Sequence, residues 1–360
     1  MSDVIAQIEG RIGCITLNRP KALNALSLDM VRQITQALLA WQNDPQVLAV
    51  AVRGTGKEGP FGAFCAGGDI RFFHQAATSG DPRLEDFFTE EYRLNHLIHT
   101  YPKPYIALMD GIVMGGGMGI SQGASVRVVT ERSKMAMPET NIGLFPDVGG
   151  GYFLSRCPGY LGEYLGLTGH MLNGEEAVHA GLADGFMASG KLAHLWQTLI
   201  ETPFENGEAV ERWVATQFDR LQKTELAHRA MMDATFAQGS VVEILQKLEL
   251  AEDEWSGQTA KILRHRSPLM LQVVLDQIRR ARKLSLADDL RMERDLVRHC
   301  FALRPVAQSE TVEGIRALAV DKDHSPKWQP ASVEAVDAAE VAAFFVSPWP
   351  AHAHPLRDLA

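Results

Sequence analysis

Two glycine runs constrain this chain more than any other feature of its sequence. The runs are Gly115–Gly117 and Gly149–Gly151. Because glycine has no side chain, such runs allow backbone N–H groups to approach a ligand and to point the same way. Two of the carboxylates between the runs stand beside turn residues, Glu139 after a proline and Asp147 eight residues later. Carboxylates beside backbone donors are typical of acid–base or nucleophilic chemistry next to a site that stabilises an anion.

The two carboxylates also have purely structural interpretations. Glu139 could close a turn after Pro138, and Asp147 could cap a helix that begins near Val148. From the local sequence alone, the catalytic and the structural interpretations stand level, and both stay open at this point.

Charge and cysteine usage exclude several classes of protein. The net charge of -9 argues against a nucleic-acid binder, which usually carries a basic excess. The four cysteines are scattered without a C-x-x-C pair, which fits a reducing compartment and predicts no metal site. The N-terminus lacks a basic segment followed by an apolar run, and no window approaches the ~20 apolar residues that span a membrane. We therefore expect a cytoplasmic protein without membrane contact.

Strand and helix patterns alternate through the first 190 residues or so, which indicates an α/β fold. The expected strands are 4–9 and 12–17, which form a hairpin, then 47–52, 105–109, 126–130 and 135–137. Helices are expected from the N-cap Ser27 to about residue 43 and over residues 84–100. After residue 190 the apolar pattern becomes helical. We accordingly expect a core at 1–190, a helical region at 191–330 and a tail at 331–360.

Two loops near the N-terminus place small or cationic residues at strand ends. Ala66, Gly67 and Gly68 follow a strand, and Asp69 could cap the next helix. Arg19 and Lys21 put two cations on one turn. That turn is either a solvated loop or a clamp for ligand phosphates, and the local sequence favours the solvated loop.

Several segments together resemble the crotonase (enoyl-CoA hydratase/isomerase) superfamily, and most of all its 3-hydroxyisobutyryl-CoA hydrolase branch. The segments are RPKALNAL, CAGGDI, FTEEYRLN, MGGGMG, AMPETNIGLFPDVGGG and VEGIRALAVDKDHSPKW. Each is weak alone, but their order and spacing over most of the chain are specific. The resemblance implies a β-β-α spiral core with trailing C-terminal helices. Such helices commonly mediate trimer or hexamer contacts, so a homo-oligomer is expected.

The resemblance also implies an acyl-CoA site. Two backbone N–H groups of the family polarise the thioester carbonyl, and by motif position they match Gly68 and Gly116. The residues expected near the adenine and phosphates of coenzyme A are Lys21, Ala22, Leu23, Ala66, Asp69 and Ile70. This raises the clamp interpretation of the Arg19–Lys21 turn. Coenzyme A would be part of the substrate, so no separate cofactor is implied.

Departures from the hydratase pattern point to hydrolysis. Hydratases of the superfamily commonly use two glutamates, and Gly119 occupies the position of the first. Glu139 matches the second, and Asp147 adds a carboxylate as in the hydrolase branch. Glu91 aligns with that branch's acidic residue facing the substrate, where it would meet a hydroxyl on the acyl group.

The expected activity is therefore hydrolysis of 3-hydroxyisobutyryl-CoA in valine breakdown, with 3-hydroxypropionyl-CoA as a further substrate. Glu139 could attack the thioester and form a mixed anhydride, or it could act as a general base on water. The sequence leaves both routes open. One alternative is an enoyl-CoA hydratase or isomerase, and another is a non-catalytic structural paralogue. Retention of Glu91, Glu139 and Asp147 together speaks against the paralogue.

Overall fold

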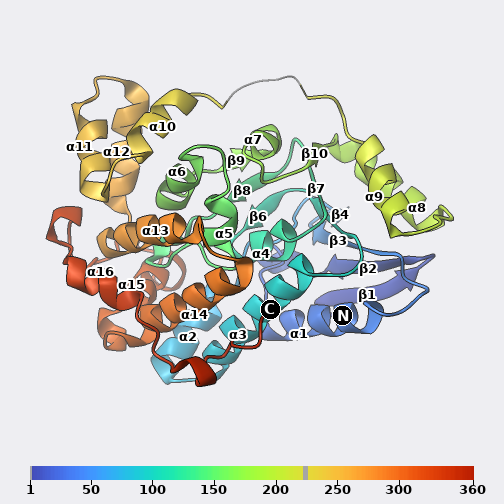
Figure 1. The fold of residues 1–360 in the computed structure, drawn as a ribbon, viewed down its shortest axis with the longest axis horizontal. Helices are drawn as coiled ribbons and strands as arrows, with labels where there is room; N and C mark the ends of the chain where they lie inside the picture. Colours follow the sequence, from blue (N-terminus) through green and yellow to red (C-terminus); the bar gives the residue numbers. More distant parts are fainter. Residues whose placement is uncertain (1, 222–225) are drawn as a thin grey trace. The chain divides into compact units, whose positions relative to one another are not determined.

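The computed structural model describes residues 2–221 and 226–360, and Figure 1 shows its fold. The chain clusters into two compact units that interleave along the sequence. Unit 1 comprises Met1–Gly68, Arg93–Ala136 and Met171–Glu225. Unit 2 comprises Asp69–Tyr92, Met137–His170 and Leu226–Ala360. The expected division at residues 190 and 330 stays a prediction.

Unit 1 holds all the strands among the described residues. Its main sheet has the order β1-β2-β3-β5-β7-β10, and β4 pairs with β3. These strands are β1 (Val4–Glu9), β2 (Ile12–Leu17), β3 (Ala49–Gly56), β4 (Gly59–Pro60), β5 (Tyr105–Met109), β7 (Val126–Val129) and β10 (Gly185–Phe186). A second sheet joins β6 (Ile112–Met114), β8 (Lys134–Ala136) and β9 (Leu172–Asn173). The β1–β2 pair is the antiparallel hairpin that the sequence predicts, whereas β2, β3, β5, β7 and β10 run parallel.

The helices of unit 1 follow local sequence signals. They are α1 (Leu28–Trp41), α4 (Gly116–Gln122), α7 (Gly174–His179), α8 (Leu192–Glu201) and α9 (Gly207–Thr216), with short 3-10 turns η1 (Pro20–Ala22) and η3 (Ser189–Lys191). Ser27 caps α1 as predicted, because its side chain accepts from the Met30 N–H. A capping hydroxyl of this kind satisfies one of the N–H groups that a helix start leaves unpaired.

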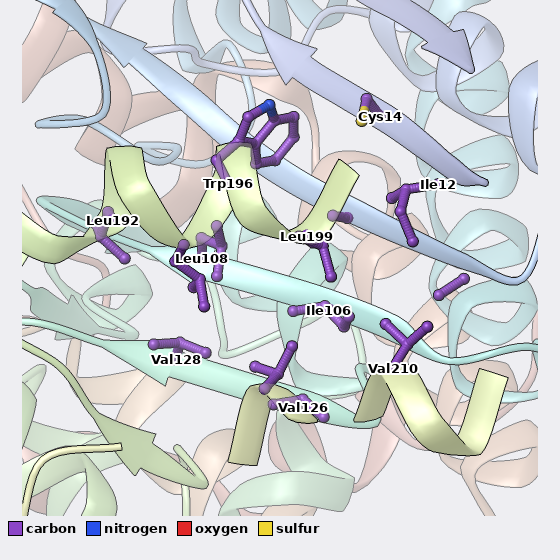
Figure 2. Packing of buried hydrophobic residues seen from close by; sticks show 14 of the residues in the cluster. Ile12, Cys14, Ile106, Leu108, Val126, Val128, Leu192, Trp196, Leu199 and Val210 are labelled. Carbon is purple, nitrogen blue, oxygen red and sulfur yellow. The ribbon is translucent and has the colours of Figure 1, made fainter. Parts of the chain in front are cut away.

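The core of unit 1 forms where α8 and α9 cover one face of the sheet (Figure 2). Ile106 and Leu108 of β5 point to this face, because alternate strand residues share a side. Trp196 and Leu199 of α8 and Val210 of α9 pack onto it. Burial of such side chains stabilises each by roughly 1.5–3 kcal/mol. The sheet is therefore fixed from one side by helices that follow it in the sequence.

Unit 2 consists of helices, turns and loops, with no strand among its described residues. Its helices are α2 (Ile70–Ser79), α5 (Gly150–Leu154), α6 (Leu161–Thr168), α10 (Arg229–Phe236), α11 (Val241–Leu250), α12 (Glu254–His265), α13 (Pro268–Ala281), α14 (Leu286–Ala302), α15 (Glu310–Ile315) and α16 (Ala338–Phe344). The short turns are η2 (Glu139–Ile142), η4 (Val306–Gln308), η5 (Arg316–Val320), η6 (Val333–Ala335) and η7 (Ala351–Ala353). The helix α3 (Arg83–His99) begins in unit 2 and passes into unit 1. Both α13 and α14 pack against the short α5.

The structure confirms the α/β class and the change to helices after residue 190. Two strands are displaced: β8 lies one residue earlier than predicted, and β3 begins two residues later than predicted and runs on to Gly56. The extension includes Arg53, which reads as a loop residue in the sequence. Its guanidinium donates to the Thr16 hydroxyl and lies 3.9 Å from the centroid of the Trp196 ring. These contacts hold the Arg53 side chain against β2 and α8, so the strand continues past its apolar part.

No helix in the described part of the chain combines the length and the apolar character needed to cross a membrane.

Candidate active site

The first glycine run lies beside the CAGGD loop in unit 1. The Cys65 N–H donates to the Ile112 carbonyl at 2.9 Å, and the Met114 N–H donates to the Cys65 carbonyl at 3.0 Å. Gly67 has a φ of +104°, and a Cβ placed there would lie 3.3 Å from the Met114 oxygen and 3.7 Å from the Gly116 nitrogen. The two loops thus approach each other as closely as residues without side chains allow. This brings the segments of Gly68 and Gly116 together.

Both predicted oxyanion donors are backbone N–H groups at the ends of these loops. Gly116 is the first residue of α4, and Gly115 precedes it with a φ of 45°. The first N–H groups of a helix have no partner inside it. Among the described residues, neither the Gly68 N–H nor the Gly116 N–H donates a hydrogen bond. The arrangement can therefore accept an anionic oxygen from outside.

The expected coenzyme A loop is anchored to the same region of unit 1. Lys21 and Ala22 lie in η1, and Leu23 follows in a left-handed conformation with its side chain exposed. The Ala66 N–H donates to the Leu23 carbonyl at 3.0 Å. The Arg19 guanidinium donates to the Ala25 carbonyl at 3.0 Å, so it holds its own loop. Lys21 is therefore the better candidate for a phosphate contact.

The buried Asn24 fixes this loop, and the sequence analysis missed it. Its amide nitrogen donates to three carbonyls, those of Thr55, Ala63 and Phe64, at 3.0–3.1 Å. Its side-chain oxygen accepts from the Arg19 N–H at 2.8 Å. An asparagine whose amide is fully used in this way is a structural residue. The signal available was its position between the loop cations and the following helix, which is weak.

The remaining predicted coenzyme A residues, Asp69 and Ile70, begin unit 2. Asp69 caps α2 as predicted, with its carboxylate accepting from the Phe72 N–H at 3.4 Å. Ile70 is the first residue of that helix. Their contact with coenzyme A stays a prediction.

The three predicted carboxylates belong to unit 2 and are all buried. Glu91 lies on α3, Glu139 starts η2, and Asp147 lies in the loop before α5. Their exposed fractions are 2%, 7% and 6%. The Tyr92 hydroxyl donates to Asp147 Oδ2 at 2.9 Å. Glu91 Oε1 and Glu139 Oε2 have no hydrogen-bond partner among the described residues, so both can receive a donor from a ligand.

Burial raises the pKa of every member of this cluster, and the charge of neighbouring carboxylates adds to the effect for Glu91 and Glu139. Burial is the main cause of the raised pKa of Glu91, followed by the charges of Asp147 and Glu139. Burial and then the charge of Asp147 raise the pKa of Glu139 well above its usual value. Burial raises the pKa of Asp147 to about 7, against the lowering effect of the Tyr92 hydrogen bond. Like charges in a low-dielectric site cannot all ionise together, so the cluster keeps protons near neutral pH.

The structure rules out a capping role for Asp147 but confirms a turn at Glu139. Asp147 does not cap a helix, since α5 begins at Gly150 after Gly149 and shows no side-chain cap. The backbone of Glu139 does form a turn, because its carbonyl accepts from the Leu144 N–H at 3.0 Å. Its carboxyl group stays buried, and Oε2 has no hydrogen-bond partner among the described residues. The structure thus leaves both carboxyl groups for chemistry.

The second glycine run does not present its N–H groups to a ligand, contrary to the expectation for such runs. The Gly149 and Gly151 N–H groups donate to the two oxygens of Glu293 on α14, at 2.7 and 2.9 Å. The Tyr152 N–H donates to Asp289 Oδ2 at 2.8 Å. The sequence analysis missed both acidic residues. Glu293 replaces an apolar residue in the stripe of Leu286, Leu290 and Val297, which was the available signal.

The loop that carries Asp147 also contains a strained residue. Val148 has a φ of 58°, which is a rare conformation for a β-branched side chain. Such backbone strain persists only where the surroundings hold it, and it clusters at functional sites.

No group of three or more metal-binding side chains occurs in the part of the chain that the structure describes.

Curated relatives resemble the chain over nearly its whole length. A protein of Gallus gallus named 3-hydroxyisobutyryl-CoA hydrolase, mitochondrial, is 42% identical over 93% of this chain and 86% of its own length. The protein of the same name from Rattus norvegicus is 40% identical, over 96% and 89% of the two chains.

The expectation of a cytoplasmic location is wrong. The relatives from Gallus gallus, Rattus norvegicus and Homo sapiens are all named as mitochondrial proteins. The expectation rested on the lack of a secretory signal and of a membrane segment. Neither feature distinguishes the cytoplasm from the interior of an organelle.

Solved structures confirm the crotonase-like fold. A carnitinyl-CoA dehydratase from Mycobacterium thermoresistibile has a TM-score of 0.89 at 38% identity, covering 99% of both chains. An enoyl-CoA hydratase from Rhodobacter sphaeroides has a TM-score of 0.86 at 36% identity, covering 96% of this chain and 98% of its own. A sequence model of the enoyl-CoA hydratase/isomerase family matches residues 12–345. The chain therefore belongs to the enoyl-CoA hydratase/isomerase family.

Proposed function

We propose that this protein is an acyl-CoA thioester hydrolase that splits 3-hydroxyisobutyryl-CoA with water into 3-hydroxyisobutyrate and coenzyme A. The observation that carries the proposal is the buried cluster of Glu91, Glu139 and Asp147. Gly119 stands where the first glutamate of a hydratase is expected. The names of the curated relatives support the same reaction.

Thioester cleavage needs a site for the oxyanion that forms when the carbonyl is attacked. We assign this role to the N–H groups of Gly68 and Gly116, which carry no hydrogen bond among the described residues. One such donor is typically worth about 3 kcal/mol of transition-state stabilisation. Because these donors are backbone groups, their contribution does not vary with pH.

Glu139 is the group assigned to activate the reaction, by either of two routes. In the first, its carboxylate attacks the thioester carbon, the C–S bond breaks, and water then opens the mixed anhydride. In the second, it takes a proton from water, whose oxygen attacks the same carbon. In both, the departing thiolate needs a proton. Asp147 is assigned this role in the state in which Glu139 is ionised, because the two buried carboxyl groups share protons and burial raises the pKa of Asp147 to about 7.

Glu91 is assigned to the hydroxyl group of the acyl chain. Its Oε1 has no partner among the described residues and can accept a hydrogen bond from that hydroxyl. A buried acceptor left without a partner disfavours an acyl chain that lacks the hydroxyl. This supports 3-hydroxyacyl substrates, including 3-hydroxypropionyl-CoA. Valine breakdown as the pathway is proposed from the name that the curated relatives share.

The proposal extends to binding. Lys21, Ala22, Leu23, Ala66, Asp69 and Ile70 are assigned to coenzyme A, which enters as part of the substrate and not as a separate cofactor. A homo-oligomer built through the C-terminal helices is proposed from the family resemblance.

A dehydratase or hydratase is the second candidate, because the two solved structures at 36–38% identity carry those names. Purified protein is supplied separately with 3-hydroxyisobutyryl-CoA, 3-hydroxypropionyl-CoA and crotonyl-CoA. Free thiol and enoyl absorbance are both followed. We expect thiol release from the hydroxyacyl substrates, and Glu139→Gln should slow it by about 10³-fold. Loss of enoyl absorbance without thiol release would establish the second candidate instead.

A further inference from the structure

A second buried acidic group lies behind the loop that carries Asp147, all within unit 2. Glu293 is fully buried on α14, and its two oxygens accept from the N–H groups of Gly149 and Gly151. Gln277 of α13, also fully buried, donates through Nε2 to Glu293 Oε1 at 3.1 Å and to the Pro146 carbonyl at 2.7 Å. The loop is therefore held on both sides of Asp147 by side chains that belong to two other helices.

Holding the loop matters because its backbone does not prefer this shape. Val148 follows Asp147 directly and adopts a φ of 58°. A conformation of this kind costs roughly 1–3 kcal/mol and relaxes when the groups that enforce it are removed. Relaxation at Val148 would turn the peptide that carries the Asp147 side chain.

We propose that Glu293 is a positioning residue for the hydrolytic reaction, acting through the Gly149 and Gly151 N–H groups and helped by Gln277, to fix Asp147 against the thioester. The inference rests on the proposed function. Glu293 has no role in substrate contact here. It sets where the Asp147 carboxyl group stands.

The neighbouring Asp289 is a second buried acid that can be compared with Glu293, because it makes fewer hydrogen bonds to the same segment. Asp289 lies one helical turn before Glu293, and only its Oδ2 accepts a hydrogen bond, whereas Oδ1 has no partner among the described residues. Glu293 uses both oxygens as acceptors, while burial and then the charge of Asp289 raise its pKa well above the usual range. Burial raises the pKa of Asp289 to about 7, against the lowering effects of the Glu293 side chain, the Tyr152 N–H and the charge of Arg156. The two buried carboxyl groups therefore share a proton near neutral pH.

This arrangement predicts that kcat is sensitive to an amide at position 293 and insensitive to an amide at position 289. In Glu293→Gln, one glycine N–H faces an NH₂ group instead of an acceptor, so we expect kcat to fall on the order of 100-fold. In Asp289→Asn, the amide oxygen can still accept from the Tyr152 N–H and the contacts of Glu293 with Gly149 and Gly151 remain, so kcat should stay within about threefold. The KM for 3-hydroxyisobutyryl-CoA should change less than about threefold in both, because substrate contacts remain.

The matched control is Glu163→Gln, which changes another fully buried glutamate of unit 2 that is bound to Arg282. It should lower the melting temperature and leave kcat unchanged. If Glu293→Gln fails to fold, Gln277→Met removes both donated hydrogen bonds without burying a new polar group. It should still lower kcat about tenfold at unchanged KM.

The outcomes separate this inference from the proposed function. Thiol release by the wild type together with full kcat in Glu293→Gln or, failing that, in Gln277→Met, overturns the positioning role alone. Equal losses in Asp289→Asn, Glu293→Gln and Glu163→Gln also overturn it, since they indicate general damage. Absence of thiol release in the wild type sinks the hydrolase, and the positioning role with it.

Discussion

The two glycine runs look alike in sequence and serve opposite purposes in the structure. Gly115–Gly117 starts a helix at which the Gly116 N–H donates to no described group. Gly149–Gly151 also starts a helix, but it donates its N–H groups to the Glu293 carboxylate. The first run leaves a place for an anion from outside, whereas the second already contains one. A glycine run therefore marks close approach of an anion, and only the packing decides whether that anion is ligand or protein.

The largest expected effect comes from crowding the first run. A Cβ at Gly117 would lie 2.3 Å from the Cys65 carbonyl oxygen, a backbone atom that cannot yield without moving the loop. We expect Gly117→Ala to separate the two donor loops and to lower kcat/KM by about 10²–10³-fold, measured by thiol release. Gly190→Ala, where a Cβ meets nothing within 4 Å, is the matched control in unit 1. If Gly117→Ala and Gly190→Ala both keep activity within threefold of wild type, Gly116 is not an oxyanion donor.

The same change in the second run should do less harm. A Cβ at Gly151 would lie 2.5 Å from Asp289 Oδ1, the end of a side chain that can turn aside. We expect Gly151→Ala to lower kcat by about tenfold, because the Asp289 and Glu293 contacts shift while the oxyanion donors stay. Gly257→Ala, which has free space on α12, serves as control. A loss equal to that of Gly117→Ala would mean that the two runs act alike.

A smaller effect concerns Asp147, which lies just before the second run, and it should appear in the pH dependence of kcat. The Tyr92 hydroxyl stabilises the ionised form of Asp147, so Tyr92→Phe should raise the Asp147 pKa above about 7. If protonated Asp147 supplies the thiolate's proton, activity then persists to higher pH. The basic limb of the kcat profile should move up by about one pH unit.

The control for this shift is Gly117→Ala, which adds no titrating group and should leave the profile unchanged in shape. A basic limb that stays in place, or moves down, in Tyr92→Phe would show that Asp147 is not the acid.

Local signals predicted much of the fold. The β1–β2 hairpin, the Ser27 cap of α1 and the Asp69 cap of α2 each depend on residues within a few positions of one another. The extension of β3 to Gly56 was not predicted, because Arg53 is held there by a strand and a helix distant in sequence.

The candidate site divides in the same way. Glycine spacing marks the donor loops, and the family resemblance marks Glu91, Glu139 and Asp147. Nothing local marks Glu293 or Gln277 as partners of the Asp147 loop, because the hydrogen bonds span 131 to 144 residues of sequence. Only the packing of α13 and α14 against α5 reveals them.

The interleaving of the two compact units has a consequence for how the protein is made. Neither unit comes from one continuous segment, so we expect no proteolytic fragment or shortened clone to yield either of them alone. Synthesis finishes the last segment of unit 1 before the final segment of unit 2 begins. The Asp147 loop leaves the ribosome long before Glu293 does. In a nascent chain, the first glycine run is therefore already synthesised at a stage when Glu293, whose carboxylate binds the second run, has not yet been translated.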